Sequence, residues 1–183
     1  MTYYGAKELA RSFRTVRKNT IQIAEEIPED KYGFRPAEGC RSVVETLSHI
    51  AVMTRVPLQI HFAQHLNTLV GFDFFGLWSK LQAEGKAPRT KAQTLELLHT
   101  EGEKFATALD GVSDAFLGEQ VEYPEPMEPR RKSRFEMLTA SKEHEMHHRG
   151  QLMVVERLLG ITPHLTRQME ERIAAMRAKQ AGA

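Results

Sequence analysis

The sequence predicts an all-α protein built on four long helices. Apolar residues recur at spacings of three and four, the period of one helix face. At three points a Ser or Thr stands three residues before a Glu or Gln, just ahead of an apolar run, as is typical of helix N-termini. Strand-like alternation is hard to find outside residues 121–123. We therefore expect helices at residues 6–27, 42–66, 91–109 and 134–159.

An apolar stripe marks the first expected helix, and capping boxes mark the starts of the other three. The stripe of the first helix consists of Leu9, Phe13, Val16, Thr20, Ile23 and Ile27. In a capping box the hydroxyl accepts a hydrogen bond from a first-turn N–H, and the Glu or Gln side chain accepts one from the N–H of the cap. The three pairs are Ser42 with Glu45, Thr90 with Gln93, and Ser133 with Glu136.

Residues 167–179 predict a fifth, shorter helix. The helix expected at residues 134–159 is followed by Gly160 and Pro163, as is common after a helix C-terminus. The segment beyond them is charged, with three apolar residues on one side: Met169, Ile173 and Met176. We expect a less buried helix that covers the bundle or a second subunit.

Two connections have unusual compositions. Residues 67–89 form a long connection that is too apolar for a solvated linker, because it contains Phe72, Phe74, Phe75 and Trp78. We expect this aromatic cluster to pack on the helices, as a pocket wall or as core. Residues 122–131 contain three prolines and predict an extended crossing.

Length and charge restrict the classes of function. A chain of 183 residues fits one domain. Its 25 Lys and Arg balance 24 Asp and Glu, so no strong field is available to hold a polyanion or an anionic lipid surface. Cys40 is the only cysteine, which excludes an internal disulfide, and no run approaches the about 18 apolar residues of a membrane span. We expect a cytoplasmic protein that binds neither nucleic acid nor membranes.

Histidines carry most of the reactive chemistry of this chain. His144 and His148 lie four residues apart, so on a helix their side chains are about 40° apart around the axis and one turn apart along it. They also continue the stripe formed by Met137, Ser141, Leu152, Val155 and Leu159. Imidazoles that face a bundle interior need polar partners. A divalent metal ion supplies one partner to both rings.

His49 is the expected third ligand. It lies in the second expected helix at helical spacing from Val52, Met53 and Val56, so we expect its side chain to face inward. Three neutral imidazoles from two helices leave an open coordination position, which is typical of catalytic metal sites. The sequence therefore predicts a mononuclear metal site formed by His49, His144 and His148.

These motifs resemble those of the DinB/YfiT-like family of metalloenzymes. The likeness covers roughly residues 6–163, and its most specific part is the late segment. The matching residues are Phe34-Arg35-Pro36, Arg41-Ser42 with Glu45 and His49, and His144 with His148-Arg149-Gly150-Gln151-Leu152.

The resemblance implies a four-helix bundle with a long crossover connection, which we place at residues 1–165. The helical tail that we expect at residues 166–183 lies beyond the likeness. It implies one divalent metal ion, zinc or nickel, held by His49, His144 and His148, and a homodimer. Activities in the family include transferases and isomerases that use low-molecular-weight thiols. We expect a hydrolase or a thiol-dependent transferase that acts on a small molecule, with the open metal position activating water or a thiol. The alternative is a metal-binding stress-response or ligand-binding module without turnover.

Spacing leaves the general base open between Glu145 and His147, with Glu143 also within reach. We expect His147 near the surface, and an ion pair between Glu145 and Arg149 at i, i+4. A di-iron site is the rival metal site, because its Glu-x-x-His spacing occurs twice in the chain. Those pairs are Glu96 with His99, and Glu145 with His148.

Two further histidines follow Pro57, which we expect to kink or interrupt the second helix. We therefore expect His61 and His65 at the surface or at a pocket rim. Gly150 lies within a predicted helix, where Gly costs about 0.8–1.0 kcal/mol relative to Ala. We expect a close backbone approach there.

Overall fold

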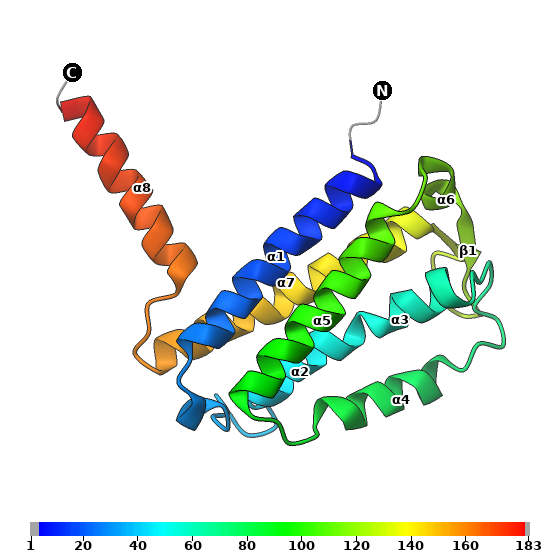
Figure 1. The fold of residues 1–183 in the computed structure, drawn as a ribbon. Helices are drawn as coiled ribbons and strands as arrows, with labels where there is room; N and C mark the ends of the chain where they lie inside the picture. Colours follow the sequence, from blue (N-terminus) through cyan, green and yellow to red (C-terminus); the bar gives the residue numbers. More distant parts are fainter. Residues whose placement is uncertain (1–3, 182–183) are drawn as a thin grey trace.

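The computed structural model describes residues 4–181 and shows a bundle of four long helices (Figure 1). These are α1 (Ala6–Glu26), α2 (Val43–Met53) with its continuation, α5 (Lys91–Asp110) and α7 (Arg134–Leu158). Helices α1 and α2 both pack against α5 and α7. Strands within residues 4–181 are confined to one two-stranded sheet. The all-α prediction is confirmed.

All three predicted capping boxes form. The Oγ atom of Ser42 accepts a hydrogen bond from the N–H of Glu45, whose carboxylate accepts one from the N–H of Ser42. The same exchange starts α5 and α7, at Thr90 with Gln93 and at Ser133 with Glu136. Each cap contributes about 1 kcal/mol, and each fixes its helix start at the following residue.

The second predicted helix is broken into three parts. Helix α2 ends at Met53, α3 (Arg55–Pro57) follows, and a π-helical segment, η2, covers Leu58–Ala63. Pro57 has no N–H to donate to the carbonyl of Met53, and its ring crowds that carbonyl. The predicted interruption is confirmed, and the helical segment ends at Ala63 rather than at residue 66.

The long connection at residues 67–89 contains an unpredicted helix, α4 (Phe74–Gly85). The Asp73 side chain caps it by accepting a hydrogen bond from the N–H of Gly76. Helix α4 packs along α2 (Figure 1). A Cβ atom placed on Gly85 would lie 3.6 Å from the Cα atom of His49, so the end of α4 rests on the site-bearing part of α2.

A short hairpin follows α5. Helix α6 (Asp114–Gly118) leads into β1 (Gln120–Glu122), which pairs antiparallel with β2 (Arg131–Ser133). The proline-rich connection joins the two strands as a hairpin loop with a turn at residues 125–126, so the predicted extended crossing is wrong. A single 3-10 turn, η1 (Glu29–Lys31), follows α1.

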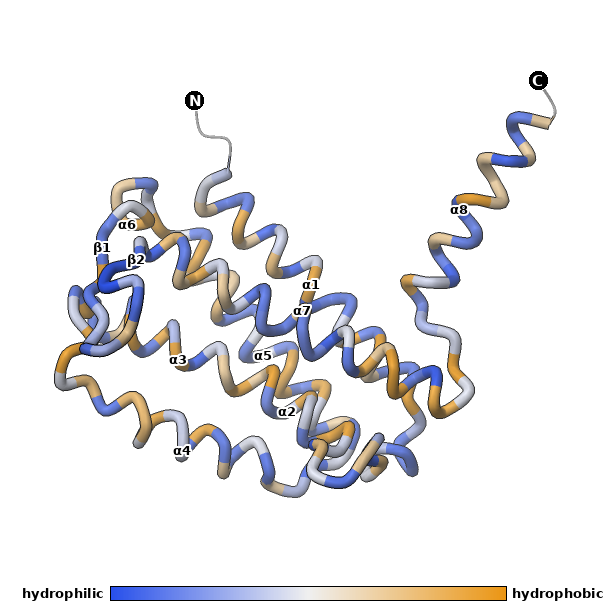
Figure 2. Tube along the Cα trace, turned by 180° about the vertical axis from the view of Figure 1, so that it is seen from behind, coloured by the Kyte–Doolittle hydropathy of each residue, from blue (hydrophilic) through white to orange (hydrophobic). Residues whose placement is uncertain are grey.

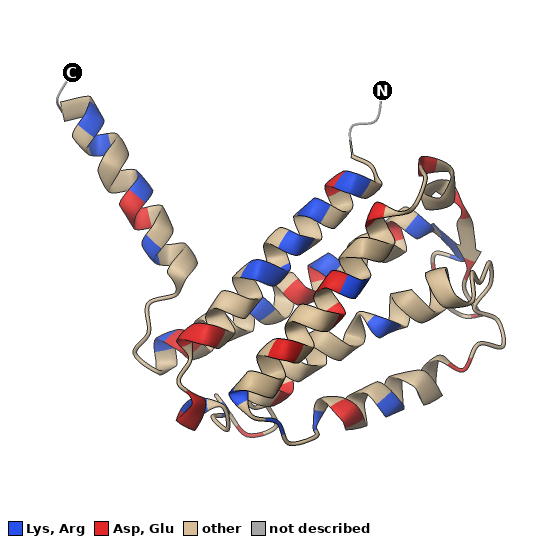
Figure 3. Ribbon diagram, in the orientation of Figure 1, with Lys and Arg blue, Asp and Glu red and all other residues tan. Residues whose placement is uncertain are grey.

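The core lies between the four long helices. Helix α2 consists mostly of hydrophobic residues, as Figure 2 shows, which agrees with its position among the other elements. Fully buried side chains come from all four long helices, and they include Leu9, Phe13, Ile23, Leu47, Leu98, Phe105, Leu138 and Leu152. Positive and negative residues are interspersed along the helices (Figure 3).

Helix α8 (His164–Ala181) extends away from the bundle (Figures 1 and 2). Met169, Ile173 and Met176 are exposed on it. The expected fifth helix is therefore confirmed, starting at His164, but it does not cover the bundle (Figure 1). The predicted division at residue 165 stays a prediction, and residues 1–3 and 182–183 of the two predicted parts lie outside the described residues. No helix within residues 4–181 is long and apolar enough to cross a membrane.

Candidate metal centre

The structure brings His49, His144 and His148 together. The Nε2 atom of His144 lies 3.1 Å from Nε2 of His49 and 3.2 Å from Nε2 of His148. One ring nitrogen from each of the three residues lies within 4.8 Å of the others. His49 and His148 are buried and His144 is partly buried. Among residues 4–181 this is the one group of three or more His, Cys, Asp or Glu side chains with metal-binding spacing.

Helix packing produces this convergence. Helix α7 presents His144 and His148 one turn apart on the face that packs against α2. Helix α2 presents His49 toward the same space. The predicted inward phase of all three rings is therefore what the structure shows.

The three imidazoles are neutral near pH 7. Burial lowers the pKa of His49 to about 3 and that of His144 to about 4, and the positive charge of Arg41 lowers both further. Burial also lowers the pKa of His148. Neutral imidazole is the form that binds metal ions. The rings are thus held ready as ligands without prior loss of a proton.

Gln151 sets the tautomer of His148. Its Oε1 atom lies 2.7 Å from Nδ1 of His148. A carboxamide oxygen only accepts, so Nδ1 carries the proton and Nε2 keeps its lone pair, directed at His49 and His144. The amide nitrogen of Gln151 lies 3.1 Å from Nε2 of His147. Gln151 belongs to the late motif, but spacing alone does not show this role.

Glu145, one of the two predicted bases, is held by Arg17 on α1. The Nε atom of Arg17 lies 2.9 Å from the Glu145 carboxylate, and both side chains are buried. Arg17 also donates to the backbone carbonyls of Leu98 on α5 and Ile50 on α2. The Arg17 guanidinium therefore connects all four long helices. Two of its partners, Ile50 and Glu145, are the residues next to His49 and His144.

The structure overturns two expectations about α7. Glu145 pairs with Arg17, so the predicted ion pair with Arg149 is wrong. The close approach expected at Gly150 is also wrong, since a Cβ atom there would meet nothing within 4 Å. The close approach lies at Gly102 on α5, where a Cβ atom would lie 2.8 Å from Cγ of Arg17. A glycine at 102 makes room for the buried guanidinium.

His147, the second predicted base, is exposed at the edge of the three rings. Its ring centroid lies 4.9 Å from that of His148, and its contact with Gln151 links it to the site. The rival di-iron arrangement is wrong, because Glu96 and His99 are exposed and Glu145 is held by Arg17.

His61 and His65 lie apart from the three rings. His61 is buried and accepts a hydrogen bond from Arg134 at Nδ1, so the predicted surface position is wrong. Its ring does line a pocket, the apolar cavity described below. Burial, with the charge of Arg134 adding to it, lowers the pKa of His61 to about 4. His65 is exposed, 2.7 Å from the carboxylate of Glu119.

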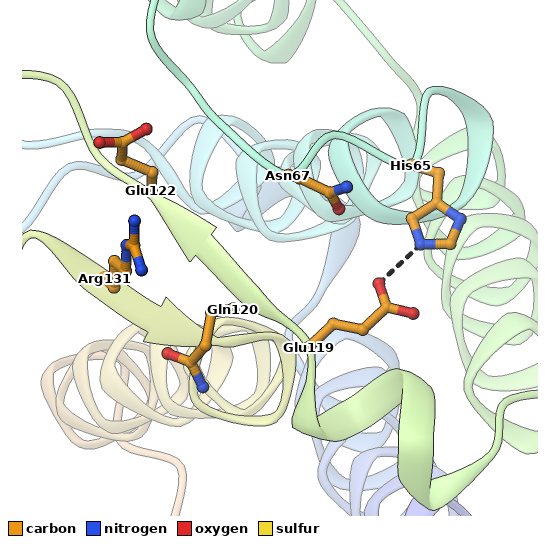
Figure 4. Close-up of a pocket in the computed structure, with 6 residues that line it drawn as sticks. All are labelled: His65, Asn67, Glu119, Gln120, Glu122 and Arg131. Carbon is orange, nitrogen blue, oxygen red and sulfur yellow. Dashed lines mark hydrogen bonds and ion pairs between the residues drawn. The ribbon is translucent and has the colours of Figure 1, made fainter.

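Figure 4 shows the polar pocket at which His65 lies, next to the β1–β2 hairpin. It has a volume of about 470 Å³ and is lined by His65, Asn67, Glu119, Gln120, Glu122 and Arg131. Within it His65 pairs with Glu119, and the carboxylate of Glu122 pairs with Arg130 beside the pocket. It is separate from the three converging histidines.

An apolar cavity of about 480 Å³ opens on His144. Its walls come from α2, α3, η2, the hairpin and α7, and from the aromatic cluster of the long connection. Phe72, Phe74 and Phe75 line it, which favours the pocket-wall interpretation of that cluster over the core interpretation. The site thus combines three neutral imidazoles with an apolar cavity.

Comparison with known proteins agrees with this fold. The model of the DinB family matches residues 1–178. The uncharacterized protein YjoA from Bacillus subtilis is 26% identical over 157 residues, covering 86% of this chain and 92% of YjoA. The crystal structure of YjoA, a DinB-like protein, has a TM-score of 0.62 at 23% identity over 85% of this chain and 94% of that one.

A second solved structure has the same fold at lower identity. YfiT from Bacillus subtilis, described as "a probable metal-dependent hydrolase with an unusual four-helix bundle topology", has a TM-score of 0.67 at 15% identity. The match covers 88% of this chain and 91% of YfiT. The family match extends over nearly the whole chain, and the bundle and its crossover agree with it. The chain belongs to the DinB family.

Proposed function

We propose that the chain is a metal-dependent hydrolase whose metal ion is held by His49, His144 and His148. The observation that carries the proposal is the convergence of three Nε2 atoms, 3.1 and 3.2 Å apart, on side chains that burial keeps neutral. These residues fit a divalent ion. All three donors are imidazole nitrogens, which suit zinc and nickel, and these are the metals we propose.

The chemistry follows from an open coordination position. A divalent metal ion with three imidazole ligands lowers the pKa of water and polarises a carbonyl oxygen. Gln151 keeps His148 in the ligand tautomer, and the Arg17–Glu145 pair fixes the helices that carry His49 and His144. The apolar cavity next to His144 excludes bulk water from a bound substrate.

His147 is the better proposal for the proton acceptor. The carboxylate of Glu145 is committed to Arg17, whereas His147 is exposed and reaches the site through Gln151. A thiolate can take the place of water as the nucleophile, which would make the chain a thiol-dependent transferase. The predicted homodimer remains a proposal, testable by light scattering.

The test measures metal content and turnover together. Protein purified without chelator is analysed for zinc and nickel and assayed on ester and amide substrates, with and without an added thiol. We expect about one metal ion per chain and turnover that stops when a chelator removes it. Thiol-independent turnover supports the hydrolase, whereas an absolute need for thiol indicates the transferase. Metal binding without any turnover would indicate a binding module.

Two ligand variants and one control variant complete the test. His49→Ala and His148→Ala should lose the metal, because each removes one of three ligands. His147→Ala is the matched control, since it removes a neighbouring imidazole outside the trio and should keep the metal while losing turnover. Equal metal content in His148→Ala and the unmodified chain would end the proposal.

A further inference from the structure

Two cavities lie on opposite sides of the three histidines. The apolar cavity contains His144, and a second cavity of about 680 Å³ contains Gln151, the partner of His148. Along α7, Ser141 and His144 line the apolar cavity, whereas Gln151 and Leu152 line the second one. The cavities therefore follow one another along this helix, with His148 between them.

Helices α2 and α4 show the same order. On α2, Val43 and Thr46 line the second cavity and Ile50 and Met53 line the apolar one, with His49 between the two pairs. On α4 the apolar cavity is lined by Phe74 and Phe75, and the second by Trp78 and Gln82, with Lys86 at the C-cap. Three helices from distant parts of the chain agree. The apolar cavity, the histidines and the second cavity thus form one row.

Two positively charged side chains are among the residues that line the second cavity. Arg41 and Lys86 line it, and no Asp or Glu is among its lining residues within the described chain. Gln151, whose carboxamide contacts His148, lines the same cavity as Arg41. A negatively charged group bound there would lie beside the metal centre.

Arg41 differs from the arginines around it. Arg35 is paired with Glu45, and Arg55 with Glu84. The partly buried guanidinium of Arg41 makes one side-chain hydrogen bond, to the neutral carboxamide of Gln82, and has no carboxylate within ion-pair distance among the described residues. A partly buried guanidinium without an anion keeps most of its five N–H donors for a ligand.

The apolar cavity opens through exposed aromatic side chains. Phe74 and Phe75 of α4 and Met127 of the hairpin connection line it, and all three are exposed. Exposed apolar groups gathered at the mouth of a cavity mark a surface that binds an apolar group. The two cavities therefore differ in charge: the second has two cations and no acidic residue among apolar side chains, whereas the apolar cavity has one residue of each sign, Lys132 and Glu136.

We propose that the substrate is an elongated organic acid with an apolar group at one end and a carboxylate at the other. This inference rests on the proposed hydrolase. The carboxylate binds Arg41 and Lys86, the apolar group fills the aromatic cavity, and the amide or ester bond between them lies at the histidines. Hydrolysis breaks the carbonyl carbon–nitrogen or carbon–oxygen bond, adding the hydroxyl of water to the carbonyl carbon and a proton to the leaving group. His144 and Gln151 are separated by seven residues of α7, so the spacer should be roughly 10 Å.

Three matched probes test the two ends separately. N-(4-phenylbutanoyl)glycine has both groups, its glycinamide lacks the charge, and N-acetylglycine lacks the apolar group. Calorimetric titration of metal-free protein measures binding without turnover. We expect the full acid to bind at least about tenfold more tightly than either truncated probe, because a charge-assisted pair and aromatic burial are each lost in one of them.

Variants assign the effect to residues. Arg41→Met should remove the preference for the acid over the glycinamide. Lys86→Met, at an exposed position, should weaken acid binding about threefold. This variant tests the proposal if Arg41→Met fails to fold. Lys80→Met is the control, because Lys80 is an exposed cation on the same helix that lines neither cavity, and it should change nothing. Phe75→Ala should weaken binding of the acid and leave N-acetylglycine unaffected.

Failure of this inference is distinguishable from failure of the proposed function. Equal binding of acid and glycinamide by the unmodified chain would overturn the inference, as would an unchanged preference in both Arg41→Met and Lys86→Met. Such results would leave a metal centre at the three histidines intact. If the chain binds neither zinc nor nickel but keeps the Arg41-dependent preference for the acid, the proposed hydrolase is wrong. The proposed anion site at Arg41 would still stand.

Discussion

Helix α7 carries buried ionisable groups at its middle and at its C-terminal end. The groups at the middle have polar partners, whereas the carboxylate at the end has none among the described residues. At the middle, Glu145 is paired with Arg17, and His144 and His148 face His49. At the end, Glu156 is fully buried and neither of its carboxylate oxygens has a hydrogen-bond partner among the described residues.

Further ionisable groups come from α1 and the start of α8, and the charges of Glu26 and Arg167 act on Glu156. His164 is buried with both ring nitrogens unpartnered within residues 4–181, and Glu26 adds a second carboxylate nearby. Arg167 pairs with Glu26 rather than with Glu156. The contrast shows that burial alone does not make a site. The middle of α7 has converging donors held by a satisfied ion pair, whereas its end has desolvated groups without a shared centre.

The largest expected effect comes from breaking the pair that holds the middle of α7. Arg17→Met should lower the free energy of unfolding by about 3–5 kcal/mol, because it leaves the Glu145 carboxylate buried and unpaired. The double variant Arg17→Met, Glu145→Leu should recover much of that loss, since it removes both charges. Urea denaturation measures both variants. A loss below about 1 kcal/mol in the single variant would show that the pair does not anchor the four helices.

A smaller effect is expected from the partner of His148. Gln151→Ala should weaken zinc affinity about 10–100-fold, because His148 loses the acceptor that fixes its tautomer. The unfolding free energy of metal-free protein should hardly change, since Gln151 is exposed. A competition titration with a chelator of known affinity measures the change. Unchanged zinc affinity would mean that Gln151 does not orient the ring.

The smallest effect is expected at the end of α7, and it depends on pH. Burial, with the nearby charge of Glu26 adding to it, raises the pKa of Glu156 from an ordinary 4.5 to about 7. The folded protein therefore holds this proton more tightly than the unfolded chain. The stabilisation is complete below about pH 4.5 and is lost as the pH rises through 7.

Glu156→Gln tests this titration. At pH 8 the variant should be more stable than the unmodified chain by roughly 1–3 kcal/mol, and at pH 4.5 the two should be nearly equal. Thermal or urea unfolding at both pH values measures the difference. Glu170→Gln, at an exposed position on α8, is the control and should show no such dependence. An equal gain at both pH values would assign the effect to something other than the charge.

Local patterns predicted much of the fold. The capping boxes at Ser42, Thr90 and Ser133 depend on residues three apart, and all three form. The His144 and His148 pair depends on one helical turn, and its phase predicted the face on which His49 meets it. Such features could be predicted because their geometry is set by the helix itself.

Features that depend on distant residues were missed. Glu145 has Arg149 four residues away, yet its partner is Arg17, 128 residues away in sequence. His61 is buried because Arg134 lies against it, a contact between η2 and α7 that no local pattern indicates. The role proposed for Arg41 likewise depends on what lines the cavity around it. Each of these required the packing of the helices to be known.

The central claim is that the three imidazoles share one ion. Anomalous X-ray diffraction from crystals grown with zinc or nickel tests it directly. We predict one strong peak per chain at about 2.0–2.1 Å from the Nε2 atoms of His49, His144 and His148. A peak bound instead by other side chains, or by fewer than three of these rings, would contradict the account.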